Sequence, residues 1–169
     1  MSKKAVLISI KPKWVVKILN GEKTIEVRKS KPKCDLPIDV YIYCTKQNAK
    51  YYIENKIYNS MINGKVVAKF TLNKVEEIEN CVDILTTKTL DCSQVLTQSC
   101  LNYEELHNYL DADYGYKGYA WHISNLVIFD KPKDLSEFRK YYRSKGFPQN
   151  RSWNLTKAPQ SWCYVESEK

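Results

Sequence analysis

Short segments of alternating or continuous apolar residues are spread along the chain, and they predict about six β-strands with helices between them. The predicted strands cover 5–10, 24–29, 38–45, 66–72, 119–129 and 160–165. The predicted helices cover 13–20, 48–62, 102–110 and 134–144. Strands and helices do not alternate regularly, so the sequence predicts a mixed α+β domain whose sheet curls into a small barrel.

Local signals mark several boundaries of these elements. Asn20-Gly21 and Asn63-Gly64 indicate a helix end and a turn. Capping-box spacing at Asn102/Glu105 and Asp134/Glu137 predicts two helix starts. The apolar parity of 119–129 shifts near Asn125, which predicts a bent or bulged strand. Residues 76–100 show no clear period of apolar residues, which predicts loops with one short helical turn. The alternation of residues 38–45 predicts a half-buried strand.

The stretch from Gly21 to Arg28 has the most informative pattern. Alternation along the predicted strand places Thr24, Glu26 and Arg28 on one face and its two apolar residues on the other, with Lys23 at the bend before it. Such a concentration of polar groups indicates a functional site. An exposed edge strand with a Glu/Arg cross-pair explains the same pattern, and the spacing alone leaves both interpretations open.

Charge is distributed unevenly along a chain whose net charge is +8. Residues 3–33 hold ten Lys/Arg against two Glu, residues 131–157 hold eight Lys/Arg against two acids, and the segment between them is acidic. If the two basic ends meet, they form the electrostatic footprint of a phosphate-bearing partner, whereas ordinary solubility charge is the alternative.

The segment 139–153 interleaves basic residues with aromatic ones. Arg139, Lys140 and Arg143 flank a pair of tyrosines, a combination that suits single-stranded nucleic acid because it offers charge for phosphates and flat faces for bases. A solvated cationic helix would look the same.

The six cysteines are scattered and form no Cys-x-x-Cys pair, which favours reduced thiols and a cytoplasmic protein. Cys81, Cys92, Cys100 and His107 have spacings that fit no standard zinc site, so we expect no metal and no cofactor. The apolar run near the start is too short for a signal peptide, and no apolar segment reaches membrane-spanning length, so we expect no membrane partner.

Gly21-x-Lys23-x-x-Glu26-x-Arg28, placed after a strand and a short helix, resembles the G-x-K-x-x-E-x-R signature of ASCH domains in the PUA-like superfamily. Further segments follow in the expected order, among them 9–12, 64–68, 121–123 and 159–162. The chain is similar to small phage- or prophage-encoded ASCH proteins of bacteria. The resemblance implies a single PUA-like β-barrel domain over 1–169, with insertions at about 48–62, 76–117 and 139–155.

The resemblance also implies a cleft for RNA binding or catalysis, lined by Lys11, Lys23, Glu26 and Arg28. Lys23 and Arg28 suit a phosphate or carbonyl oxygen, and Glu26 suits a base edge or the orientation of Arg28. Trp14 and Trp162 offer stacking faces, although each suits a core position as well. Arg139, Lys140 and Arg143 complete the predicted nucleic-acid-binding set.

Three function classes follow from these observations. The first is binding of RNA or another nucleic acid, or of a nucleoside or nucleotide. The second is a hydrolase, either a ribonuclease or an enzyme like the acylcytidine amidohydrolases of the family, with Lys23, Glu26 and Thr24 as catalytic residues. Here Glu26 stands where the amidohydrolases carry their nucleophilic threonine, which weakens that comparison. The third is a phage module that binds a protein partner through the acidic segment 76–113.

Overall fold

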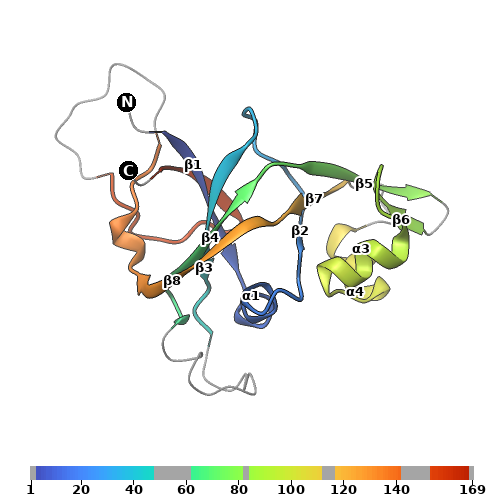
Figure 1. Cartoon of the computed structure of the whole chain (residues 1–169), viewed down its shortest axis with the longest axis horizontal. Helices are drawn as coiled ribbons and strands as arrows, with labels where there is room; N and C mark the ends of the chain where they lie inside the picture. Colours follow the sequence, from blue (N-terminus) through green and yellow to red (C-terminus); the bar gives the residue numbers. More distant parts are fainter. Residues whose placement is uncertain (1–2, 48–61, 82–83, 112–116, 142–152, 168–169) are drawn as a thin grey trace. The chain divides into compact units, whose positions relative to one another are not determined.

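The computed structural model of the chain describes residues 3–47, 62–81, 84–111, 117–141 and 153–167 (Figure 1). These residues form a mixed α+β fold with nine strands in two sheets, so the predicted class is confirmed and the strands exceed the six expected. The chain divides into two compact units. The first comprises 1–16, 38–70 and 126–169, and the second comprises 17–37 and 71–125.

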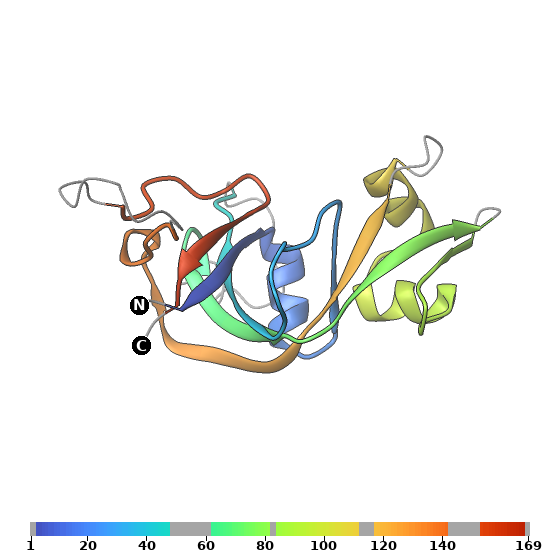
Figure 2. The same ribbon diagram turned by 90° about the horizontal axis from the view of Figure 1, so that it is seen from above.

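The first unit is built on a five-stranded sheet with the order β8-β4-β3-β1-β9. Its strands are β1 (Lys4–Ile10), β3 (Ile38–Cys44), β4 (Val66–Leu72), β8 (Ser124–Lys133) and β9 (Trp162–Glu166). β1 pairs in parallel with β3 and antiparallel with β9, and Figure 2 shows β9 beside β1. β3 is therefore a central strand. Tyr41 and Tyr43 are buried on the face that we expected to be open, so the prediction of a half-buried strand is wrong.

The second unit is built on a four-stranded sheet with the order β2-β7-β5-β6. Its strands are β2 (Ile25–Arg28), β5 (Val75–Cys81), β6 (Ile84–Thr86) and β7 (Gly118–His122). Helices α3 (Cys92–Ser99) and α4 (Tyr103–Leu110) lie side by side next to β6 (Figure 1). Apolar residues of the sheet and of both helices form one core cluster, whose buried members are Ile25, Val27, Ile78, Leu85, Val95, Leu106, Leu110 and Ala120.

Most predicted boundaries agree with the structure. Helix α1 (Pro12–Leu19) ends before Gly21, which has φ of +75° and donates its N–H to the carbonyl oxygen of Ile18. The capping box at α4 is present, with reciprocal hydrogen bonds between Asn102 and Glu105. The long strand predicted over 119–129 is interrupted at Ile123, which separates β7 from β8, and Asn125 has φ of +49°.

Two further predictions are wrong. Residues 76–100 were expected to form loops with one short helical turn, but they contain most of β5 and all of β6, and their helix, α3, has eight residues. Of the helix predicted over 134–144, the part up to residue 141 is described, and in that part only one 3-10 turn is present, η2 (Leu135–Glu137). After that turn Arg139 and Lys140 are extended, because their backbones bridge to Asn154 and Val165. The helix predicted over 48–62 lies outside the described residues apart from Ile62, and the prediction of one domain with insertions stays a prediction.

Candidate functional site

Strand β2 positions the charged residues of the signature. It pairs antiparallel with β7, and its register places Glu26 opposite Trp121 and Arg28 opposite Tyr119. Ile25 and Val27 enter the core cluster of the second unit, so Glu26 and Arg28 share the other face of the strand. The predicted alternation therefore holds for Glu26 and Arg28, which are buried as well, whereas Thr24 precedes the strand and is exposed.

Lys23, Glu26 and Arg28 form one buried charged cluster. Glu26 Oε2 lies 3.3 Å from Lys23 Nζ, and Glu26 Oε1 lies 2.9 Å from Arg28 Nη2. The three residues are 3%, 7% and 8% exposed. Two cations share one carboxylate, so this cluster carries a formal charge of +1 in a region of low dielectric. Glu26 therefore pairs with both cations through its two oxygens.

The segment before β2 connects this cluster to helix α3. Lys23 Nζ donates a hydrogen bond of 2.6 Å to the carbonyl oxygen of Ser99, the last residue of α3. The ammonium thereby satisfies a carbonyl that the helix leaves without an intrahelical donor. Thr24 is exposed. Its N–H donates to the Gln98 carbonyl, and its hydroxyl lies 3.3 Å from the Gln98 side chain.

Tyr109 on α4 completes the surroundings of Arg28, and our sequence interpretation missed it. The positive charge of the Arg28 guanidinium acts on the Tyr109 phenol. Burial raises the pKa of Tyr109, and the positive charges of Arg28 and Lys29 act in the opposite direction. Lys29 forms an ion pair with Asp111, and its ammonium lies 5.7 Å from the centre of the Tyr109 ring. The spacing of Tyr109 in α4 resembles that of an ordinary helix-surface residue, so no local signal indicated this contact.

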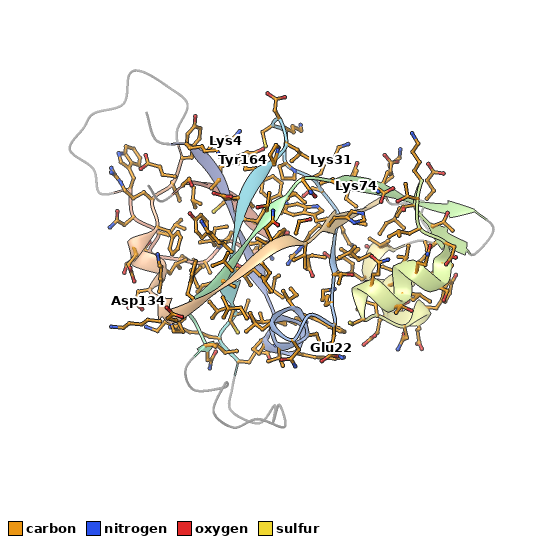
Figure 3. The ribbon with its side chains drawn as sticks, in the orientation of Figure 1. Lys4, Glu22, Lys31, Lys74, Asp134 and Tyr164 are labelled. Carbon is orange, nitrogen blue, oxygen red and sulfur yellow. The ribbon has the colours of Figure 1, made fainter. Side chains whose placement is uncertain are left out.

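Exposed lysines follow the buried cluster along the chain. Lys29, Lys31 and Lys33 are exposed and come directly after β2 in the same unit. The Lys31 ammonium, labelled in Figure 3, lies 5.2 Å from the centre of the Tyr119 ring. Buried and exposed cations are therefore concentrated between residues 23 and 33, as the charge distribution of the sequence indicated.

The remaining predicted binding residues belong to the first unit. Lys11 is exposed, and Trp14 is half-buried with the Lys13 ammonium 4.2 Å from its ring centre. Trp162 is half-buried and packs edge-to-face on Tyr164 at 5.4 Å. Tyr164 in turn lies 3.6 Å from the ammonium of Lys4, and Figure 3 shows these two residues side by side.

The backbone conformation of the basic residues after η2 differs from the helix that the sequence predicts. Arg139 and Lys140 are exposed on extended backbone, not on a cationic helix. Arg139 lies 3.9 Å from Glu166. Arg143 lies outside the described residues, so the basic and aromatic interleaving of this segment is described only in part.

A second charged cluster lies in the segment 74–89 and on β7, which the sequence analysis did not identify. Glu76 accepts from Thr89 Oγ1 at 2.8 Å and lies 3.0 Å from Lys74 Nζ and 2.7 Å from His122 Nε2. Burial acts to raise the pKa of Glu76, but hydrogen bonds from Lys74, Thr89 and His122 outweigh burial and lower that pKa to about 2. This carboxylate joins β5, β7 and the loop before α3, which explains why a polar segment forms a strand.

Two further observations concern ligands and membranes. Within the described ranges, no three His, Cys, Asp or Glu side chains are grouped as metal ligands would be. None of the described helices combines the length and the apolar character needed to cross a membrane.

Comparison with known proteins gives a structural likeness only. No family model matches the sequence, and no curated protein matches it. The crystal structure of ASCH from Zymomonas mobilis is 16% identical, with a TM-score of 0.57 over 96% of this chain and 87% of that chain. Two variants of that protein match as well. The variant with a tyrosine-to-phenylalanine substitution has a TM-score of 0.56 over 97% of this chain and 91% of that chain. The variant with a serine-to-alanine substitution has a TM-score of 0.58 over 96% of this chain and 88% of that chain. The ASCH fold predicted from the signature is therefore confirmed.

Proposed function

With the ASCH fold as the premise, we propose that this chain binds nucleic acid, and RNA in the first place, through the cluster of Lys23, Glu26 and Arg28. The observation that carries the proposal is the fixed excess of positive charge in this cluster beside the exposed lysines at 29, 31 and 33. A guanidinium held by a carboxylate keeps a defined direction, so Arg28 is suited to a phosphate oxygen. The exposed lysines add attraction that does not depend on sequence.

The net charge of +8 supports the same class of partner. The resemblance of the signature to ASCH domains, together with the shared fold, favours RNA over a general anion. Glu26 has a positioning role in this proposal, because both of its oxygens face the cations of the cluster. Its removal would leave Lys23 and Arg28 next to each other without a counter-charge.

The test measures the affinity of the purified chain for a fluorescein-labelled single-stranded RNA of 12 nucleotides by anisotropy, between 50 and 200 mM salt. The variant Arg28→Gln makes the cluster formally neutral. We expect a loss of roughly 10- to 100-fold in affinity and a shallower salt slope by about 0.7, the value for one phosphate contact on a single strand. Lys17→Gln is the matched control, because Lys17 is in the same unit and pairs with the exposed Glu22.

Different outcomes distinguish the function classes. An equal loss of affinity in Arg28→Gln and Lys17→Gln would contradict the role of the cluster, since only net charge would then matter. The RNA is recovered on a gel after each titration. Cleavage that disappears in Lys23→Gln and Glu26→Gln would favour the hydrolase with Lys23, Glu26 and Thr24. A wild-type chain that binds no RNA at 50 mM salt would refute the proposal and leave a nucleoside or a protein partner.

A further inference from the structure

Tyr109 exposes an aromatic ring beside the buried charges. It is 40% exposed, although Leu106 and Leu110 on the same helix are buried in the core cluster. The positive charge of Arg28, which is itself almost fully buried, acts on the Tyr109 phenol. Tyr109 is therefore a large aromatic residue that is partly open to water beside the buried charges.

The charges around the ring are arranged for an anionic chain that carries flat groups. The Lys29 ammonium lies 5.7 Å from the ring centre, and Asp111 holds this lysine in place through an ion pair. Arg28 is the last residue of β2 and Lys29 follows it, and the positive charges of both act on the Tyr109 side chain. Proteins that bind single strands combine these two parts, a cationic path for phosphates and an aromatic face for bases.

An anchored ring is a better platform than a mobile one. A tyrosine has few rotatable bonds, and the Lys29 ammonium beside the ring limits them further, so little conformational entropy is lost when a base stacks on it. A partner protein could also use an exposed tyrosine. The two cations beside the ring favour a polyanion over a peptide of ordinary composition, and that choice is open to experiment.

We propose that Tyr109 is a stacking platform for one unpaired base, with Lys29 contacting the adjacent phosphate. This inference rests on the proposed RNA binding and adds the class of ligand, which is a single strand with at least one unstacked base. Duplex RNA offers no such base. The inference assigns Tyr109 and Lys29 to the binding surface, whereas the signature includes neither.

The experiment compares two labelled hexamers with the same number of phosphates, an oligouridine and an abasic oligomer. Tyr109→Leu removes the aromatic face and keeps an apolar side chain of similar bulk, and Tyr109→Trp keeps an aromatic face. Tyr103→Leu is the matched control, because Tyr103 lies on the same helix but stacks on His107. Thermal unfolding of each variant checks that it is folded.

We expect wild type and Tyr109→Trp to bind oligouridine about 5- to 150-fold more tightly than the abasic oligomer, the range that stacking of one base provides. Tyr109→Leu should bind both oligomers with the affinity that wild type has for the abasic oligomer, and Tyr103→Leu should behave as wild type. Photocrosslinking of bromouridine-containing RNA to the wild-type chain should modify the peptide that contains Tyr109, which tests the contact without any substitution.

Three results would overturn the inference. If Tyr109→Leu retains the preference for oligouridine while Arg28→Gln loses RNA binding, Tyr109 has no stacking role and the proposed function stands. If crosslinks appear only on peptides without Tyr109, the base binds elsewhere. If wild type binds neither oligomer nor the longer RNA, this inference and the proposed function both fail, and an exposed ring for a protein partner becomes the explanation.

Discussion

Replacement of Glu26 by Gln is the sharpest test of the electrostatic argument. Glu26 is the carboxylate shared by Lys23 and Arg28, with contacts of 3.3 and 2.9 Å. The amide of Gln has nearly the same size and can still accept hydrogen bonds. The substitution therefore removes the charge and leaves two cations next to each other in a site where each residue is less than a tenth exposed.

The magnitude follows from burial. Two unit charges about 3 Å apart attract each other by about 5 kcal/mol at an effective dielectric constant of about 20. Desolvation offsets much of that attraction in the intact cluster, but loss of one partner leaves the desolvated cations without compensation. Breaking a buried pair in this way costs about 3–5 kcal/mol. A domain of this size has a total free energy of unfolding of about 5–15 kcal/mol, so the loss is a large fraction of it.

Urea unfolding followed by tryptophan fluorescence measures this loss, because Trp121 is fully buried and lies opposite Glu26 on β7. With a slope of about 2 kcal/mol per molar urea, the midpoint of Glu26→Gln should fall by about 2 M. Glu22→Gln is the control. It removes an exposed carboxylate paired with Lys17 and should leave the midpoint unchanged.

A double variant separates charge from packing. Lys23→Met in the Glu26→Gln background removes one of the two adjacent cations, so the midpoint should recover by part of the loss. If Glu26→Gln unfolds at the same urea concentration as wild type, the shared carboxylate does not stabilise the fold. If Glu26→Gln is destabilised and the double variant does not recover, the loss comes from hydrogen bonding and not from the uncompensated charge.

Two further predictions follow from pKa values. The pKa of Glu76 is lowered to about 2 in the fold, so the ionised carboxylate stabilises the fold above the ordinary pKa of 4.5, and this stabilisation is lost as the pH falls towards 2. The free energy of unfolding in urea should therefore decrease by about 3 kcal/mol between pH 5 and 2. Glu76→Gln should make this pH dependence weaker, and an unchanged pH dependence would contradict the lowered pKa of Glu76. Burial raises the pKa of Cys44 to about 12, so a thiol reagent at pH 8 should modify Cys44 only after unfolding. Peptide mass spectrometry measures the labelling, with half-buried Cys92 as the internal reference. Rapid labelling of Cys44 in the native chain would refute its burial.

The sequence predicted those elements whose burial pattern is decided locally. Strand β2 alternates, helix α4 has its capping box, and Gly21 stops α1, so all three were found. Strand β5 was missed because its sequence is mostly polar. One of its acidic residues, Glu76, is buried by partners at 74, 89 and 122, and no local pattern reveals such contacts.

The false helix over 134–144 shows the opposite error. The N–H of Asp134 donates a hydrogen bond to the Glu137 side chain, as the capping-box spacing predicted. The chain nevertheless leaves the helical conformation after one turn. The backbone of Lys140 pairs with Val165 on β9, a long-range contact that competes successfully with a local helix signal.

The candidate site was predicted in composition but not in environment. Alternation placed Glu26 and Arg28 together, and the bend placed Lys23 beside them. Their deep burial depends on Trp121, on the end of α3 and on α4, which the sequence did not place. Tyr109 was missed for the same reason, because Arg28 and Lys29, whose charges act on it, lie far from it in the chain.

The pairing of β1 has a consequence for protein synthesis. β1 emerges from the ribosome before the other described strands, but its antiparallel neighbour β9 is formed by residues 162–166, which are translated after all of them. All segments of the second unit are complete once residue 125 has been made. Since compact units fold during synthesis as their segments become available, the charged cluster can assemble while one side of β1 still waits for its partner. A stalled or shortened translation product would thus carry a formed candidate site on a chain with an uncovered strand, a substrate for chaperones and proteases.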